Sequence, residues 1–178
     1  GASSSHSLMP LHIAFLGCGF ITGVHSRHLR RLRSDIACSY ASRDRGKAEQ
    51  FRRSYGGHRS YASYGDAMAD SSVDAIVVAV PPRFHLELTL QALDAGKHVL
   101  VEKPAFPRLA DYETVLGART RAGKLVLVGE NDHYKPLAVC LRQLLERGAI
   151  GEMVFGHFTT LVKKFKTADD WRNDETMA

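Results

Sequence analysis

The chain has 178 residues, of which 44% are hydrophobic and 24% charged, and its formal net charge is +5 at pH 7. This composition is typical of a globular protein with room for one good core and the start of a second. No apolar run approaches the roughly 20 residues of a membrane-spanning helix, and the start of the sequence lacks the basic and apolar regions of a secretion signal, so we expect no membrane partner.

The first eight residues, GASSSHSL, precede Met9, the first residue that could start translation. We interpret residues 1–8 as a tag or a disordered extension and leave them out of the predicted fold.

The three cysteines, Cys18, Cys38 and Cys140, are odd in number, lie far apart and form no C-x-x-C pair. They indicate neither a disulfide framework nor a zinc site, and we predict no bound metal. This cysteine usage fits a reducing, cytoplasmic location.

Strand-like and helical patterns alternate along the chain. The apolar strand-like runs are Ile13–Leu16, Ile36–Ala41, Ala75–Val80, His98–Val101 and Leu125–Val128, with a poorly patterned strand at His58–Tyr61. The segments with helical spacing are Phe20–Leu32, Asp44–Tyr55, Tyr64–Ala69, Phe84–Ala95 and Arg108–Arg121. This alternation predicts an α/β fold, a doubly wound parallel sheet of the Rossmann type, with the runs 75–80 and 125–128 buried on both faces.

Beyond that sheet the pattern changes. A helix is predicted at Lys135–Arg147, opened by Pro136 and closed by Gly148, and a long strand at Glu152–Val162. A single strand is not a domain. We therefore expect a Rossmann domain at residues 9–130 and the incomplete start of a second α/β domain at 131–178, whose uncovered strand 152–162 would mediate self-association.

The segment LHIAFLGCGFITGVHSRHLRRL runs from an apolar strand through a glycine turn into a helix. Gly17 permits a sharp turn, Gly19 lets the backbone approach phosphate oxygens, and the free N–H groups of the helix attract negative charge. The third glycine of G-x-G-x-x-G is replaced by Thr22, so taken alone this motif fits a tight strand-to-helix turn as well as a dinucleotide site. We predict that a pyrophosphate contacts Gly17, Cys18, Gly19, Phe20, Ile21 and Thr22.

The end of the second strand bears on cofactor choice. An Asp or Glu there would accept hydrogen bonds from the ribose of NAD, but this chain reads Ser42, Arg43. The Ser42 hydroxyl and the Arg43 guanidinium can hold a 2′-phosphate, with Arg45 or Lys47 adding charge, so we predict NADP in preference to NAD. Asp44 leaves two alternatives open, a contact with an NAD ribose or a cap for the following helix.

Basic residues are numerous on two of the predicted helices, which raises nucleic acid as a partner. They alternate with core positions, without interleaved aromatic residues or a groove-reading motif. We interpret them as solvated helix faces that attract a phosphorylated ligand, and expect no nucleic-acid binding.

Three further segments make the glycine signal specific: VDAIVVAVPPRFHLELTLQALDAGKHVLVEKP, GENDHYKP and LRQLLERGAIGEMV. Together with the glycine turn they resemble the Gfo/Idh/MocA oxidoreductases, a family that pairs a Rossmann domain with a C-terminal α/β domain. The resemblance covers about residues 11–171, and AGKHVLVEKP is its sharpest part.

The resemblance implies roles for particular residues. The family's Glu-Lys-Pro motif is Glu102, Lys103 and Pro104 here, and its lysine, Lys103, is the expected catalytic residue, which positions the substrate hydroxyl and the nicotinamide. The turn after the fourth strand, Val80, Pro81 and Pro82, would line the cofactor, although Pro82 replaces a hydrogen-bonding side chain. His85 is expected near the cofactor in a packing or capping role, and Asn131 near the nicotinamide edge.

The chain also departs from the family pattern. His133 and Tyr134 stand where an Arg-Tyr or Arg-Phe pair is usual, so no substrate contact is carried over from that arginine. The family's acid/base segment would begin after Ala178, so no catalytic His or Asp is assigned, and the 178 residues alone are expected to bind cofactor without turnover. His25 and His28, three residues apart, suggest a metal only weakly.

The leading hypothesis is the cofactor-binding portion of an NAD(P)-dependent dehydrogenase that transfers a hydride between nicotinamide and a sugar, polyol or related hydroxyl compound, as a homo-oligomer. The alternative is a non-catalytic NAD(P)-binding sensor or scaffold module, which would not need Lys103. A methyltransferase using S-adenosylmethionine is disfavoured, because it generally has an acidic residue where Ser42 and Arg43 stand.

Overall fold

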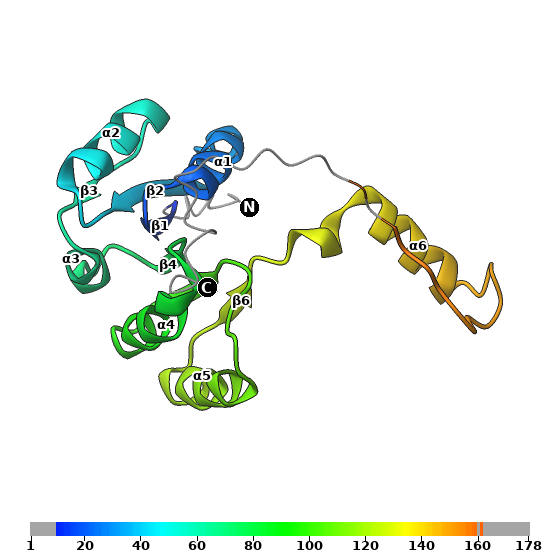
Figure 1. The fold of residues 1–178 in the computed structure, drawn as a ribbon. Coiled ribbons are helices and arrows are strands. Elements are labelled where there is room, and N and C mark those ends of the chain that lie inside the picture. The colour runs from blue at the N-terminus through cyan, green and yellow to red at the C-terminus, as the bar shows by residue number, and fades with distance from the viewer. Residues whose placement is uncertain (1–9, 160, 162–178) are drawn as a thin grey trace, which may run out of the picture. The chain divides into compact units, whose positions relative to one another are not determined.

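A computed structural model describes residues 10–159 and 161 (Figure 1). The described residues up to Gly129 form one compact unit, and those from Glu130 onward form a second. The division falls one residue before the domain boundary expected from the sequence. Residues 1–8 and the polar end of the chain lie outside the described residues.

The first unit is built on six parallel strands in the order β3-β2-β1-β4-β5-β6. The strands are β1 (Leu11–Leu16), β2 (Ile36–Ala41), β3 (Ser60–Tyr61), β4 (Ala75–Val78), β5 (His98–Val101) and β6 (Val126–Val128). Ile13 of β1 lies opposite Cys38 of β2 on one side and Ala75 of β4 on the other. This order confirms the predicted doubly wound sheet of the Rossmann type.

Helices cover both faces of the sheet (Figure 1). The helices of this unit are α1 (Phe20–Leu29) with a 3₁₀ extension at Arg30–Leu32, α2 (Arg45–Tyr55), α3 (Tyr64–Ala69), a 3₁₀ turn at Pro82–Phe84, α4 (His85–Asp94) and α5 (Leu109–Ala122). The expected helices at 20–32, 44–55, 64–69, 84–95 and 108–121 therefore match within one or two residues.

The core has two layers because side chains alternate along each strand. On one face, Ala14 and Leu16 of β1 pack with buried residues of α3, α4 and α5. On the other face, Ile13 and Phe15 pack with Tyr40 and with partly buried residues of α1 and α2. The sheet is thus apolar on both sides, as a parallel sheet between helices must be.

Strand β6 corrects one expectation. The run 125–128 was expected to be buried on both faces, but Leu125 is 55%, Leu127 58% and Val128 41% exposed. Among the described segments, β6 is the last strand of the sheet and pairs with β5 alone. Val126 packs against the core beneath α5, whereas Leu127, one residue on, lies on the opposite face of the sheet.

The second unit holds a 3₁₀ turn at Asn131–Tyr134 and helix α6 (Pro136–Glu146), which begins with a proline at its first turn as expected. The strand predicted at 152–162 is wrong for its described part, because residues 151–159 and 161 adopt no strand. A strand needs a neighbour with which to exchange backbone hydrogen bonds, and no described segment pairs with this one. Self-association through this segment stays a prediction.

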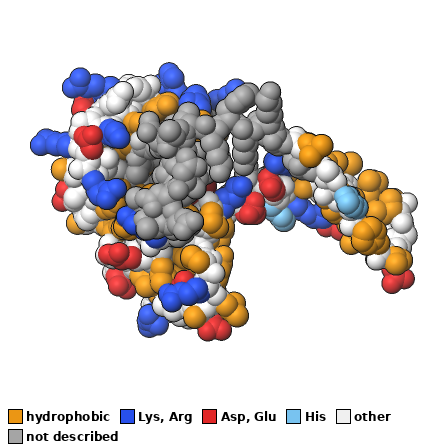
Figure 2. Space-filling model, viewed as in Figure 1, with side chains coloured by type: hydrophobic (Ala, Val, Ile, Leu, Met, Phe, Trp, Pro, Cys, Tyr) orange, Lys and Arg blue, Asp and Glu red, His pale blue; other side chains and the backbone are white. Residues whose placement is uncertain are grey.

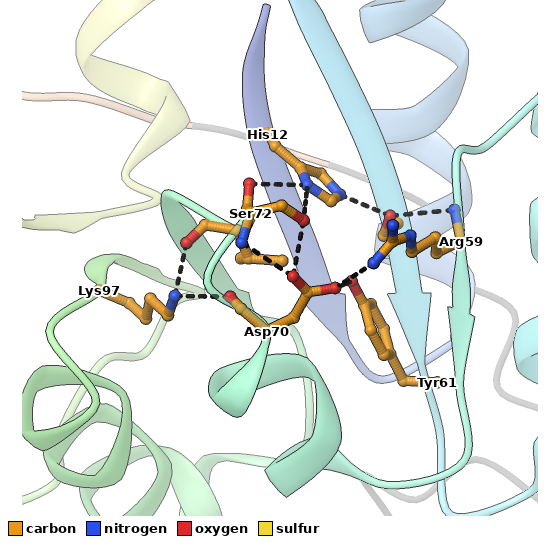
Figure 3. Close-up of polar contacts among 8 residues, drawn as sticks. His12, Arg59, Tyr61, Asp70, Ser72 and Lys97 are labelled. Atoms are coloured by element: carbon orange, nitrogen blue, oxygen red, sulfur yellow. Dashed lines mark hydrogen bonds and ion pairs between the residues drawn. The ribbon is translucent and has the colours of Figure 1, made fainter.

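A polar cluster lies near the amino ends of the strands, where side chains converge on Asp70 (Figure 3). One oxygen of Asp70 accepts from Arg59 Nη1 at 2.7 Å and Tyr61 Oη at 2.8 Å, and the other accepts from the amide and hydroxyl of Ser72. Lys97, only 7% exposed, donates to the carbonyls of Asp70 and Val73, at 2.7 Å each. Every charge in this cluster is paired or hydrogen-bonded, which makes it a structural element.

Candidate functional site

The carboxyl ends of the parallel strands β1, β4 and β5 lie at the same end of the sheet. The chain leaves β1 toward β2 on one side and reaches β4 on the other, so the strand order reverses between β1 and β4. In doubly wound sheets, ligands bind in the crevice outside such a reversal. The glycine turn follows β1, the proline turn follows β4 and the Glu-Lys-Pro segment follows β5, so the fold brings all three motifs to this end of the sheet.

Gly17 and Gly19 play different parts in the turn. Gly17 has φ +101°, and a Cβ placed on it would lie 2.4 Å from the carbonyl oxygen of Ala79. Gly19 has φ −107°, and a Cβ on it would meet no atom within 4 Å. The first glycine is thus required by the fold itself, whereas the second leaves open space in front of helix α1, where a ligand's phosphates would lie.

Helix α1 begins at this open space with its N–H groups free of a side-chain cap and without an acidic residue in its first turn. Both features leave the positive end of the helix dipole available to an anion. Phe20 is 81% exposed, and Ile21 is partly buried against the core.

Thr22, at the position of the missing third glycine, is fully buried, and its hydroxyl donates to the Gly17 carbonyl at 2.7 Å. It therefore braces the turn from within. Gly23, one residue later, allows helix α1 to pack closely against α2, since a Cβ there would lie 2.8 Å from Tyr55 Oη of α2. Cys18 is half-buried, and burial raises the pKa of its thiol to about 11, which agrees with a spacer role.

At the end of β2, Asp44 caps helix α2. Its Oδ1 accepts from the amides of Gly46 at 2.9 Å and Lys47 at 3.3 Å, and its own amide donates to Ser42 Oγ at 3.1 Å. Of the two alternatives left open by the sequence, the structure shows the helix cap.

Arg43, which is exposed, lines a pocket of about 210 Å³ with residues of α3, the proline turn and α4. Its guanidinium carbon lies 5.8 Å from the centre of the Phe84 ring. The other lining residues are Tyr64, Val80, Pro81, Glu87 and Leu88. Pro82 is buried at the start of the 3₁₀ turn and lies outside this lining. The pocket thus has an apolar wall, and its charged lining residues are Arg43 and Glu87.

Basic side chains lie over α1 and α2 on the surface (Figure 2). Two of them share one carboxylate: Glu49 pairs with Arg52 and Arg53, each at 2.7 Å, and these pairs hold the pKa of its carboxyl well below its usual range. The pairs lie on a partly exposed helix face, with Arg53 the exposed member.

The Glu-Lys-Pro segment follows β5. Glu102 is buried, with 8% exposure, whereas Lys103 is exposed, and the Lys103–Pro104 peptide is cis. Among the described residues, the Lys103 ammonium has no hydrogen-bond or ion-pair partner. Within the described part of the chain, the segment thus presents an ammonium without a partner at the carboxyl end of β5.

Two histidines hold this segment. His25 of α1 lies with Nε2 2.5 Å from Glu102 Oε1, and His85 of α4 lies with Nδ1 3.0 Å from the carbonyl oxygens of Pro104 and Ala105. The Nε2 of His85 lies 2.8 Å from the Val80 carbonyl oxygen, and the side chain is 1% exposed. His85 therefore packs between two loops, with its ring nitrogens turned toward protein carbonyls.

Sequence reasoning missed the role of His25, which it considered only as a weak metal ligand with His28. Among the described residues, no group of three or more His, Cys, Asp or Glu side chains is arranged to hold a metal ion. The partner of His25 is 77 residues away, so only the fold brings the two together. Asn131 lies in the second unit, and its contact with a nicotinamide stays a prediction.

None of the helices in the described ranges is long and apolar enough to cross a membrane.

Comparisons with known proteins identify the family and agree with the fold. Residues 11–130 match the model of the Gfo/Idh/MocA oxidoreductase family with its NAD-binding Rossmann fold. A D-xylose 1-dehydrogenase (NADP⁺) of Hypocrea jecorina is 36% identical over 124 residues, which cover 67% of this chain and 32% of that protein. A myo-inositol 2-dehydrogenase of Thermotoga maritima is 27% identical, covering 80% of this chain and 42% of that one.

Among solved structures, an NAD-binding oxidoreductase from Klebsiella pneumoniae matches with a TM-score of 0.75 and 28% identity, over 81% of this chain and 40% of that one. The chain thus spans less than half the length of each of these proteins. Since the family model covers most of the chain, the chain belongs to the Gfo/Idh/MocA oxidoreductase family, whose NAD-binding Rossmann fold is formed here by residues 11–130.

Proposed function

We propose that the full-length protein is a dehydrogenase that prefers NADP and acts on a sugar, a polyol or a related hydroxyl compound. The observation that carries this proposal is the exposed Lys103, which has no partner among the described residues and follows β5 at the same end of the sheet as the glycine turn. The similar D-xylose and myo-inositol dehydrogenases support the substrate class.

The residues at this end of the sheet fit a dinucleotide. The space in front of Gly19 and the uncapped N-terminus of α1 suit a pyrophosphate, because the N–H groups there donate to phosphate oxygens without a side chain in the way. The pocket beside Arg43 suits the adenosine half, since its apolar wall at Val80, Pro81 and Phe84 can cover a flat ring.

The positive charge near the end of β2 favours NADP over NAD. An NAD-selective site has an acidic residue at the end of β2, but Ser42 and Arg43 stand there, and Asp44 uses its Oδ1 to cap α2. Arg43 and Lys47 are both exposed and offer cations to a 2′-phosphate, and the Ser42 hydroxyl lies beside them.

When bound, the nicotinamide supplies the hydride donor or acceptor. Lys103 holds the substrate hydroxyl by a hydrogen bond from its ammonium and takes part in moving the proton of that hydroxyl. Glu102, buried beneath the lysine, keeps the backbone of the segment in place by accepting from the Lys103 amide at 3.3 Å.

The proposal is tested by two measurements on the full-length protein. The first is the affinity for NADPH and NADH by fluorescence titration, and the second is a screen of sugars and polyols for reduction of NADP⁺. Lys103→Met should abolish turnover of the substrate found while leaving the Kd for NADPH within about tenfold. Lys124→Met, at the amino end of β6, is the matched control and should leave both unchanged.

Either of two results would contradict the proposal. If the protein binds neither nucleotide, the cofactor assignment is wrong. If it binds NADPH but Lys103→Met turns over as well as the wild type, the protein is not a dehydrogenase that uses this lysine.

A further inference from the structure

Glu102 and Lys103 are neighbours of opposite charge, yet they form no ion pair in the structure. A buried carboxylate beside an exposed ammonium would normally be expected to attract it. Something therefore engages the Glu102 carboxylate and leaves the lysine available.

The contacts of Glu102 show which groups engage its carboxylate. Its Oε1 lies 2.5 Å from His25 Nε2, and its Oε2 accepts from the Lys103 amide at 3.3 Å. Its carboxylate also packs on Gly129, where an added Cβ would lie 3.3 Å from Oε1. Both oxygens are thus occupied and the side chain has little room to rotate.

His25 is itself held in place. Its ring stacks on Phe15 of β1, with centroids 6.2 Å apart and planes at 26°, and Phe15 is 1% exposed. Helix α1, which carries His25, begins at the glycine turn. The same helix thus contributes to the proposed pyrophosphate site and to the Glu-Lys-Pro segment. His85 fixes the other end of the Glu-Lys-Pro segment at Pro104 and Ala105. The contacts of Glu102 therefore decide the conformation of the rest of the segment.

We infer that His25 is a positioning residue for Lys103: by binding Glu102 it keeps that carboxylate from pairing with the Lys103 ammonium, which stays directed at the nicotinamide and the substrate hydroxyl. The inference rests on the proposed function and adds a residue to it. Without the His25 contact, Glu102 Oε1 becomes a buried acceptor without a partner, and the nearest mobile donor along the chain is the ammonium of Lys103.

The test separates the two halves of the cofactor. In the full-length protein, the Kd is measured for NADPH and for 2′-phospho-ADP-ribose, which lacks the nicotinamide. His25→Ala should weaken NADPH about fivefold, the loss of roughly one hydrogen bond, and leave 2′-phospho-ADP-ribose within about twofold. His25→Gln, whose amide can donate to Glu102, should restore most of the NADPH affinity. His28→Ala, an exposed histidine on the same helix, is the matched control.

A double-mutant cycle distinguishes positioning from general packing. If His25 acts through Lys103, His25→Ala should have no effect on NADPH affinity in a Lys103→Met background. If it merely supports α1, the loss persists in both backgrounds and extends to 2′-phospho-ADP-ribose, which would overturn the inference.

Unchanged NADPH affinity in His25→Ala would also overturn it. Should His25→Ala fail to fold, His25→Asn, a polar residue too short to reach Glu102, takes its place in the cycle. If the wild type binds neither NADPH nor NADH, the proposed function fails and the inference falls with it, a result visible before any variant is made.

Discussion

Gly17 lies directly against the backbone of Ala79, so that a methyl group on Gly17 would come within 2.4 Å of the Ala79 carbonyl oxygen. The turn after β1 therefore packs on the end of β4 without space for a side chain. Its φ of +101° adds to the constraint. Gly17→Ala should destabilise the fold by at least about 2 kcal/mol, because strain and a backbone clash combine. Urea unfolding followed by circular dichroism measures this, and unchanged stability would contradict it.

Gly19→Ala should behave in the opposite way. The backbone at Gly19 suits any residue, and the added Cβ meets open space, so the free energy of unfolding should stay within about 0.5 kcal/mol of the wild type. The same methyl group stands in the proposed phosphate cradle, and the affinity for NADPH should fall at least about tenfold, which is 1.4 kcal/mol. A Gly19→Ala protein that binds NADPH normally would place the pyrophosphate elsewhere.

Arg43→Ala should reduce the affinity for NADPH about tenfold and leave that for NADH nearly unchanged, since only the 2′-phosphate needs the extra cation. The two Kd values are measured by fluorescence titration at the same ionic strength. Arg119→Ala, at the end of α5, is the control for a loss of one positive charge far from the site. An equal loss for both nucleotides would assign Arg43 to the adenosine pocket instead.

His12 makes the stability of the fold depend on pH. Its Nδ1 lies 2.9 Å from the Ser72 carbonyl oxygen and therefore donates, which leaves Nε2 to accept from Ser39 Oγ at 2.7 Å (Figure 3). Burial is the main cause that lowers the pKa of His12 below 6.5, helped by the nearby His58 and opposed by the Ser72 carbonyl, Asp70 and Asp74.

Because the folded-state pKa of His12 is the lower one, its contribution to stability is complete above pH 6.5 and is lost as the pH falls from 6.5 toward the folded value. The free energy of unfolding of the wild type should therefore drop between pH 7.5 and 5.5 more steeply than that of His12→Asn. Asp70, whose pKa is held well below its usual range by Ser72, Tyr61 and Arg59, contributes in a separate window below about pH 4. Equal slopes for the two proteins between pH 7.5 and 5.5 would contradict the assignment to His12.

Thr89 of α4 is fully buried, and its hydroxyl has no hydrogen-bond partner within the described part of the chain. Thr89→Val replaces that hydroxyl by a methyl group of nearly the same size. It should raise the free energy of unfolding by about 0.5–1 kcal/mol, because an unsatisfied buried polar group is removed. Thr89→Ser, which keeps the hydroxyl, should not stabilise the protein, and a destabilised Thr89→Val would show that the hydroxyl has a partner.

The alternation of apolar strands with helical segments was enough to predict the doubly wound sheet. It was enough because a parallel sheet covered by helices leaves an apolar run for each strand and an apolar stripe for each helix. The helix cap at Asp44 was among the alternatives read from the sequence for the same reason: it is a local interaction within three residues of the chain.

The errors lie where the outcome depends on neighbours in space. The runs 125–128 and 152–162 have the apolar composition of buried strands, but burial and pairing depend on what lies beside them. β6 is an edge strand with one neighbour, and no described segment pairs with residues 152–159. Composition alone carries no information about either.

The sequence by itself determined the fold class, the family and the positions of the glycine turn and the Glu-Lys-Pro segment, because all of these are local signals. Only the tertiary structure decided which side chains meet: Thr22 with the Gly17 carbonyl, His85 with two loops, and His25 with Glu102. The last pair joins residues 77 positions apart, and such a contact is set by the packing of α1 over the sheet, which no local pattern encodes.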